Sequence, residues 1–304
     1  MDRDPYHEGE KALQRRAGVR EQARKVGAIV DATIFPAAAR FLAEQRILVA
    51  ASLDAHGRPW ASLLTGPPGF ARAVDETLLR IATAPVPGDP LAANLAARAE
   101  LGLLAIDLRT RRRIRVNGRA ILRDDGIYLS AAEVYGNCPK YIRPREIARE
   151  DTGAPRDPRV ASALTPAQRA LVARADTFFI ASAHHRTGAD ASHRGGPPGF
   201  VTVRADGGLS FPDFPGNNMF NTLGNLAVDP RVGLLFVDFE KGGVLQITGT
   251  ASLGDRRVDV SVESVVAIAR ATHLRWRVAG PAAGWPAVTP TRRPASEDER
   301  GGFE

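Results

Sequence analysis

The strongest constraint on the fold of this 304-residue chain is an internal repeat. The pentapeptide GPPGF begins at Gly66 and again at Gly196. Further along, NLA, GLL and the matching pair RVNGRA and QITGTA recur in the same order, after an insertion of one residue. Motifs that recur in one order indicate a duplicated structural unit. The fold is therefore expected to be one that a segment of about 130 residues can build twice.

Each copy has the sequence pattern of a small antiparallel barrel. Short apolar runs, at residues 47–52 and 178–183, are closed by turn-forming residues. Pro-Pro-Gly then interrupts each copy, and two consecutive prolines exclude an interior strand at that point. Segments 91–99 and 219–227 are the expected short helices. We predict a mainly β fold with flanking helices, made of two tandem split β-barrels that form a pseudo-dimer within the chain.

The boundaries of the repeat divide the chain into five expected parts. Outside the barrels, residues 8–30 and 261–278 are predicted to be helical, and Thr165-Pro166 resembles a helix start. The polar C-terminal end is expected to be disordered. The parts are an N-terminal helical segment (1–36), a first barrel copy (37–130), a helical connector (131–174), a second barrel copy (175–280) and a C-terminal tail (281–304).

The net charge of +7 raises the question of a nucleic-acid partner. The main basic cluster consists of Arg109, Arg111, Arg112, Arg113 and Arg115, between two strand-like runs. No aromatic residues alternate with these arginines, and the sequence has neither a helix-turn-helix nor a zinc pattern. We predict a solvated hairpin tip and no nucleic-acid partner, with a phosphate-binding patch as the alternative.

The sequence also predicts the compartment. No apolar run approaches the roughly 20 residues needed to cross a bilayer, so no membrane partner is expected. The charged N-terminal stretch lacks the apolar core of a signal peptide. The one cysteine, Cys138, excludes an intrachain disulfide, which suits a reducing cytoplasm. Abundant Ala and Arg with little Lys indicate GC-rich bacterial coding. We expect a cytoplasmic, bacterial protein.

The second copy carries a resemblance to a known family. Its stretches ADASHRGGPPGF, FPDFPGNN and NLAVDPRVGLLF resemble the FMN-binding split-barrel proteins related to pyridoxamine 5'-phosphate oxidase. The resemblance covers residues 176–253 well and residues 46–122 more weakly, and YGNCPKYI is similar to the helix motif that follows the barrel in relatives. It implies FMN at the junction of two barrels, a junction that single-barrel relatives form by homodimerising.

The chemistry of the second copy agrees with this implication. The guanidinium of Arg194 suits a phosphate or a ring carbonyl, and Ser192 lies on the same face of the expected strand. A turn with two asparagines precedes a helix whose N-terminus favours an anion. Asp190 and Arg194 can equally form a surface ion pair, and the turn can be a plain one. The expected cofactor-binding residues are Asp190, Ser192, Arg194, Gly199, Phe200, Asp213, Asn217, Asn218, Asn221, Thr222 and Lys140.

The first copy lacks this chemistry. It has Trp60 and Leu64 where the second copy has an aspartate and an arginine, and Asp89 in its turn would repel a phosphate. Relatives carry basic residues near the phosphate turn, where this chain has asparagines. We therefore predict that the flavin binds to the second copy and that the first copy is a degenerate partner.

Histidine and cysteine do not indicate a metal site. His184, His185 and His193 lack the spacing of a zinc motif, so they are interpreted as loop residues and no metal is expected. Cys138 is interpreted as a small buried residue rather than a nucleophile.

The leading hypothesis is an FMN-dependent oxidoreductase that acts on a small-molecule substrate or electron donor; no catalytic residue is identified. Oxidation of pyridoxamine phosphate itself is not expected, because the C-terminal stretch ATHLRWRVAGPAAGWP lacks the family's arginine–histidine pattern. The alternatives are a non-catalytic flavin- or haem-binding protein and a reductase that uses a deazaflavin coenzyme. Further homo-oligomerisation stays open.

Overall fold

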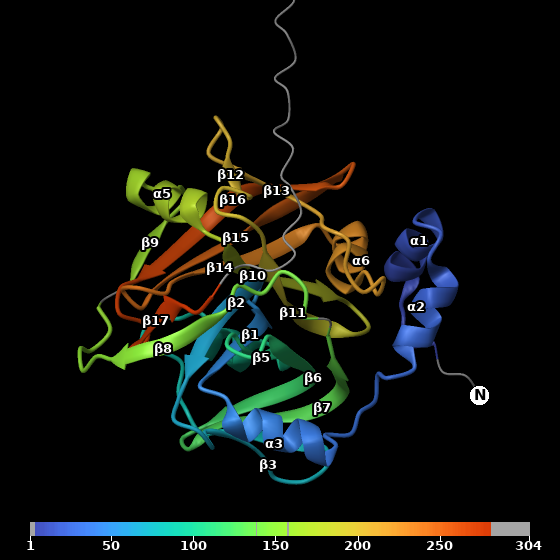
Figure 1. Cartoon of the computed structure of the whole chain (residues 1–304), viewed down its shortest axis with the longest axis horizontal. Coiled ribbons are helices and arrows are strands. Elements are labelled where there is room, and N and C mark those ends of the chain that lie inside the picture. The colour runs from blue at the N-terminus through green and yellow to red at the C-terminus, as the bar shows by residue number, and fades with distance from the viewer. Residues whose placement is uncertain (1–3, 138, 157, 281–304) are drawn as a thin grey trace, which may run out of the picture.

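The structure is a computed structural model that describes residues 4–137, 139–156 and 158–280. Each copy of the repeat forms one antiparallel sheet (Figure 1). The first sheet comprises β1 (Ile47–Leu53), β2 (Pro59–Thr65), β3 (Ala71–Ala73), β4 (Leu78–Ile81), β5 (Glu100–Asp107), β6 (Arg112–Arg123) and β7 (Gly126–Gly136). The second comprises β10 (Thr177–His184), β11 (Gly188–Gly195), β12 (Thr202–Val203), β13 (Leu209–Pro212), β14 (Arg231–Asp238), β15 (Gly243–Gly254) and β16 (Arg257–Ile268), and the short strand β9 (Arg159–Ala161) also pairs with β16.

The two sheets have the same strand order. The first runs β2-β1-β5-β6-β7-β4-β3, and the second runs β11-β10-β14-β15-β16-β13-β12. Short helices precede equivalent strands, α4 (Leu91–Ala97) before β5 and α6 (Asn221–Val228) before β14. The predictions of a mainly β fold and of a tandem duplication are confirmed.

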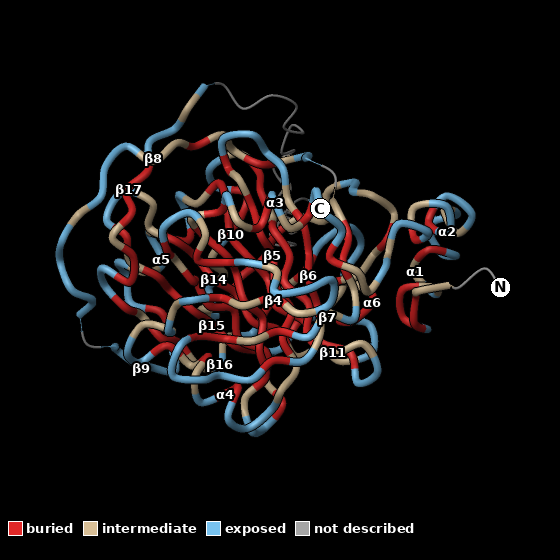
Figure 2. Tube along the Cα trace, turned by 90° about the horizontal axis from the view of Figure 1, so that it is seen from below, coloured by how far each residue is buried: buried red, intermediate tan, exposed pale blue. Residues whose placement is uncertain are grey.

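Each barrel has an apolar core of its own, and a third apolar core is shared by both barrels. In β1, Leu48 faces the interior of the first barrel, while Val49 belongs to a core shared by both copies. In β10, Phe178 faces the second interior, and Phe179 faces the shared core. Both strands are therefore buried on both faces, which explains their continuous apolar runs. Figure 2 shows that buried chain extends through both sheets without a solvated layer between them.

The contact between the barrels is symmetric. A Cβ on Gly102 would lie 2.4 Å from the carbonyl oxygen of Ala189, and one on Gly233 would lie 2.6 Å from that of Pro59. The two glycines occupy equivalent positions in β5 and β14, and each meets the other copy's second strand. Strands β8 (Arg145–Glu150) and β17 (Leu274–Val278), which follow the two barrels, pair antiparallel with each other. Each barrel therefore contacts the other through equivalent residues, which is the pseudo-two-fold arrangement predicted from the repeat.

The N-terminal segment forms helices but not the single predicted one. Helices α1 (Glu8–Arg16) and α2 (Arg20–Gly27) are separated at Gly18, whose φ of 68° is left-handed. They lie at one end of the molecule, beside α6, as both views show (Figures 1 and 2). Helix α3 (Pro36–Glu44) packs separately against the first barrel.

Two predicted helical regions are strands instead. The connector at 131–174 begins with the end of β7, continues through β8 and β9 (Arg159–Ala161), and is helical only in α5 (Pro166–Arg174), which Thr165 caps. The predicted helix at 261–278 consists of β16 and β17. The end of β7 and the end of β16 each extend a strand pair past a β-bulge, and the bulge interrupts the alternation that identifies a strand. Cys138 and the tail at 281–304 lie outside the described residues.

No helix in the described part of the chain is long and apolar enough to cross a membrane.

Candidate functional site

A cleft of about 510 Å³ lies where the second copy meets the first. The second copy contributes part of β11, the segment 212–223, which leads into α6, and also Phe200 and Arg256. The first copy contributes Arg113 and Arg115 of β6, followed by residues 137, 140 and 141 beyond β7. Ala17 and Val19, between α1 and α2, complete the lining. The cleft therefore depends on three separate parts of the chain.

Most of the residues predicted from the sequence line this cleft. They are Ser192, Arg194, Phe200, Asp213, Asn217, Asn218, Asn221, Thr222 and Lys140. Asp190 and Gly199 do not line it. Asp190 is buried beneath the cleft, and Gly199 lies exposed in the Pro-Pro-Gly turn with a φ of 88°.

Arg115 is a site residue that the sequence interpretation missed. It is 6% exposed, and its Nη1 donates to both carboxylate oxygens of Asp190, at 3.0 and 2.9 Å. Its Nη2 donates to the hydroxyl of Ser192. The solvated hairpin predicted for the arginine run is therefore wrong at its C-terminal end, because strand β6 begins at Arg112 and carries Arg115 inward. Arg109, Arg111 and Arg112 are exposed, while Arg113 lines the cleft.

The same contact corrects the interpretation of Asp190 as a surface ion-pair partner of Arg194. Asp190 is 5% exposed and pairs with Arg115 of the other copy. Burial raises the pKa of the Asp190 carboxyl, and the charge of Arg115 opposes that shift. This ion pair connects β6 of the first barrel to β11 of the second barrel beside the cleft.

Arg194 is a half-buried cation that lines the cleft. Its Nη1 donates to the backbone oxygen of His193 at 3.2 Å. Among the described residues, no carboxylate lies within ion-pairing distance of its guanidinium. Burial lowers the pKa of Arg194, and Asp213 opposes the shift from a distance. The remaining donors of Arg194 are therefore available to an anionic ligand.

The segment before α6 has an unusual backbone. Asn218 and Phe220 both adopt left-handed conformations, with φ values of 65° and 63°. Phe220 is the N-cap residue of α6, and no side chain caps the helix. Thr222, in the first turn, donates its hydroxyl to Ser192 at 3.0 Å. Uncapped amides at a helix start favour an anion.

An aromatic wall forms another side of the cleft. The ring of Tyr141 lies 5.4 Å from that of Phe214, which lies 6.4 Å from Phe200. The Tyr141 hydroxyl donates to the backbone oxygen of Pro215 at 2.8 Å and so fixes the ring. Such a wall suits a flat heteroaromatic ligand.

The equivalent position in the first copy is filled by protein side chains. Gln246, which aligns with Arg115, donates to Ser62 at 3.1 Å and to Asp89 at 3.1 Å. Ser62 in turn donates to Asp89 at 2.6 Å. Burial raises the pKa of Asp89 to about 6. The two pseudo-equivalent sites therefore differ, one being an open cationic cleft and the other a closed network with an acidic group.

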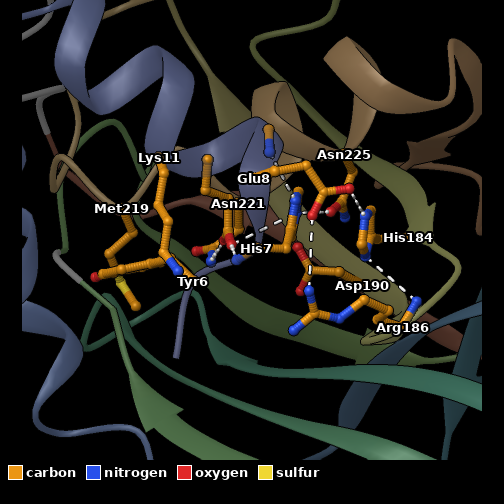
Figure 3. Close-up of polar contacts among 12 residues, drawn as sticks. Tyr6, His7, Glu8, Lys11, His184, Arg186, Asp190, Met219, Asn221 and Asn225 are labelled. Atoms are coloured by element: carbon orange, nitrogen blue, oxygen red, sulfur yellow. Dashed lines mark hydrogen bonds and ion pairs between the residues drawn. The ribbon is translucent and has the colours of Figure 1, made fainter. Parts of the chain in front are cut away.

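Two of the histidines interpreted as loop residues are buried strand residues. His184 ends β10 and stacks on His7 with ring centroids 3.8 Å apart and planes 8° apart, and Glu8 lies beside them (Figure 3). Ring nitrogens bind metals in the plane of the ring. Two parallel stacked rings cannot both point their lone pairs at one ion, so these three residues do not fit a metal. His193 lies within β11, and burial holds its pKa well below the ordinary value.

Comparison with known proteins gives one extended match. A family model described as pyridoxamine 5'-phosphate oxidase matches residues 34–154 and again residues 164–286. No curated protein matches the chain.

Solved structures match with low similarity. HupZ of Group A Streptococcus is 13% identical with a TM-score of 0.28, and the match covers 34% of this chain and 93% of that one. The FAD binding protein from Mycobacterium smegmatis is 13% identical with a TM-score of 0.26, covering 37% and 98%. An F420 reductase is 12% identical with a TM-score of 0.23, covering 32% and 91%.

Proposed function

The chain belongs to the pyridoxamine 5'-phosphate oxidase family, and on that premise we propose that it is an FMN-dependent oxidoreductase with one flavin in the cleft of its second copy. The observation that carries this proposal is the difference between the two pseudo-equivalent sites. Only the second copy has an open cleft with an arginine that lacks an ion-pair partner among the described residues. The first copy places Asp89 and Gln246 in the corresponding space.

The charge of the cleft fits a phosphate-bearing ligand. Its lining includes one carboxylate, Asp213, and five cationic side chains, which are Arg113, Arg115, Arg194, Arg256 and Lys140. Asp190 compensates Arg115, so the excess positive charge lies nearer the mouth. A phosphate monoester carries about −1.5 to −2 charges at neutral pH. Arg194 can bind it with two parallel, charge-assisted hydrogen bonds, and the uncapped start of α6 adds backbone donors.

The aromatic wall fits the ring system of the same ligand. Phe200, Phe214 and Tyr141 offer apolar surface, while Ser192 and Thr222 offer hydroxyl groups nearby. FMN, when bound, would exchange electrons with a small-molecule substrate or electron donor. The part of the protein is to bind and orient the ring and the phosphate. Its cleft volume of about 510 Å³ lies within the usual range for small-molecule sites.

The first test compares equivalent residues of the two copies. Arg194→Ala should weaken FMN binding by roughly 10- to 100-fold, because a hydrogen bond to a charged group contributes about 1.5–3 kcal/mol. Leu64→Ala, at the aligned position of the first copy, should leave FMN affinity unchanged. Fluorescence quenching during titration of the apoprotein gives both affinities, after circular dichroism has shown that both variants are folded. Unchanged affinity in Arg194→Ala would remove this residue from the site, and selective loss in Leu64→Ala would move the flavin to the first copy.

The second expected result is a stoichiometry of one FMN per chain. In the first copy, the side chains of Ser62, Asp89 and Gln246 occupy the equivalent space and bond to one another, so we expect no second flavin there. Titration at concentrations well above the dissociation constant should therefore reach its end point at one equivalent. Absorption spectroscopy and mass measurement of any ligand released by heat would distinguish FMN from a deazaflavin or a haem. Two equivalents of FMN would contradict the asymmetry, and a different chromophore would overturn the choice of FMN.

A further inference from the structure

The N-terminal segment (residues 4–30) contacts the cofactor cleft, although it lies outside the duplicated unit. The family match begins at residue 34, so this segment is an addition to the part shared with the family. It packs on α6 of the second copy, where Gly9 and Gly224 allow the two helices to touch. A Cβ on Gly9 would lie 2.2 Å from the carbonyl oxygen of Gly224. The equivalent helix of the first copy, α4, packs against the strands β1, β2 and β6.

Three side chains of this segment bond to the segment between Met219 and Asn225. Gln14 is fully buried and donates its Nε2 to the backbone oxygen of Met219 at 2.9 Å. Glu10 accepts a hydrogen bond from the side-chain amide of Asn221 at 2.6 Å. His7 bonds to Asn225 at 2.8 Å, as Figure 3 shows. The first two bonds lie on the turn that lines the cleft.

The conformation of that turn needs external support. Asn218 and Phe220, on either side of Met219, are both left-handed, which is unfavourable for a side chain as bulky as that of Phe220. The bond from Gln14 fixes the peptide group of Met219 between them. Arg20 donates to Oε1 of Gln14 at 2.9 Å and also bonds to Asp4, so Gln14 is itself held in place.

We propose that the N-terminal segment is part of the cofactor site, and that Gln14 and Glu10 are positioning residues which hold the turn at residues 217–222 in its flavin-binding conformation. The inference rests on the proposed function for the identity of the ligand. When the segment detaches, the turn relaxes, and only the fraction of molecules with a held turn binds the flavin. The apparent dissociation constant therefore rises in proportion.

Glu10 adds a dependence on pH. Burial raises its pKa to about 8, and the charges of Glu133 and Asp190 act in the same direction. The groups that face it are His7 and Tyr6 of its own segment, Glu133 and Tyr135 of β7, and Asp190 of β11, with Arg115 beyond Asp190. Because the pKa of Glu10 is raised, packing of the N-terminal segment against the second copy favours the neutral, protonated form of Glu10. This contribution is complete at low pH and is lost as the pH rises through about 8.

The first experiment compares Gln14→Ala with Gln45→Ala. Gln45 is the matched control, because it is buried and donates to a backbone oxygen, that of Phe41, at 2.7 Å in the first copy. Gln14→Ala should raise the FMN dissociation constant about tenfold, through loss of one buried hydrogen bond, and Gln45→Ala should leave it unchanged. Hydrogen exchange of the ligand-free proteins should show faster exchange at residues 217–222 in Gln14→Ala only.

A second experiment covers the case in which Gln14→Ala does not fold. FMN affinity of the wild type should fall as the pH rises through about 8, and this fall should be absent in Glu10→Gln. Glu10→Gln keeps an oxygen for Asn221, so at pH 7 it should bind FMN more tightly than Glu10→Ala. The inference is overturned if folded Gln14→Ala has the same hydrogen exchange at residues 217–222 and the same FMN affinity as the wild type. It is also overturned if FMN affinity depends on pH in Glu10→Gln as it does in the wild type. If the wild type binds no FMN, the proposed function fails, and the exchange comparison still decides this inference.

Discussion

Replacing Arg115 by methionine should lower the free energy of unfolding by about 3–5 kcal/mol and abolish measurable FMN binding. The substitution removes the ion-pair partner of Asp190, a carboxyl that is only 5% exposed. It also removes the hydrogen bond that Arg115 donates to Ser192 from the opposite barrel. Loss of Arg115 lets burial raise the pKa of Asp190 further. The protonated form is then favoured in the folded state, so the variant should be least destabilised at low pH and lose more stability as the pH rises.

Chemical denaturation at pH 5 and pH 8 measures this effect. Arg109→Met is the matched control, because Arg109 belongs to the same arginine run but is exposed, and its replacement should change stability by less than about 0.5 kcal/mol. Adding Asp190→Asn to Arg115→Met removes the uncompensated charge and should recover part of the loss at pH 8. Equal stability of Arg115→Met and Arg109→Met would show that the buried pair does not support the fold.

The architecture could be predicted because duplication leaves its trace in short local motifs. GPPGF at Gly66 and Gly196 marks the same turn in both barrels, and the continuous apolar runs of β1 and β10 mark strands buried on both faces. The region at 261–278, which includes most of β16, was predicted as a helix for a local reason. The register of β16 shifts at a bulge opposite Thr248 and Gly249, so its valines do not alternate regularly along the whole strand. The strand conformation of this region is stabilised by its pairing with β15, and the local sequence pattern gives no information about that pairing.

The candidate site was predictable on one side only. Ser192, Arg194 and the turn before α6 lie in the copy that resembles the family, so their neighbourhood could be anticipated from sequence. Arg115 lies in the other copy and is hidden in a run of arginines that is otherwise exposed. One signal could have identified it: Ile114 and Val116 flank it, and it aligns with the uncharged Gln246 of a core strand.

The contact of the N-terminal segment was beyond local inference altogether. Gln14 and Met219 are 205 positions apart, and neither belongs to a motif. The close approach of Gly9 and Gly224 depends on two single glycines whose partners only the folded chain reveals. Contacts of this kind are set by the packing of whole elements, and no periodicity in either segment encodes them.

Replacing Gly102 by alanine should separate the barrels and cost about 3 kcal/mol of stability. The new Cβ would lie 2.4 Å from the carbonyl oxygen of Ala189 and 2.6 Å from the Cα of Asp190. Both are backbone atoms, so no side-chain rotation relieves the clash. β11 must move, and with it Asp190 and Ser192, which Arg115 contacts from the first copy. FMN affinity should therefore fall together with stability, by about tenfold or more, because about 1.4 kcal/mol of lost binding corresponds to tenfold.

The pseudo-symmetry of the chain supplies the control. Gly233→Ala makes the equivalent clash against Pro59 and Trp60, beside the closed network of the first copy. It should destabilise the protein to a similar degree but weaken FMN binding less. The cleft is lined by β11, which Gly102 contacts, and not by β2, which Gly233 contacts. Gly243→Ala, a strand glycine with its nearest atom 3.5 Å away, should change neither quantity. Thermal unfolding and FMN titration of the three variants give both readouts. Equal loss of FMN affinity in Gly102→Ala and Gly233→Ala would mean that binding follows overall stability, and wild-type stability in both would contradict the close contact between the barrels.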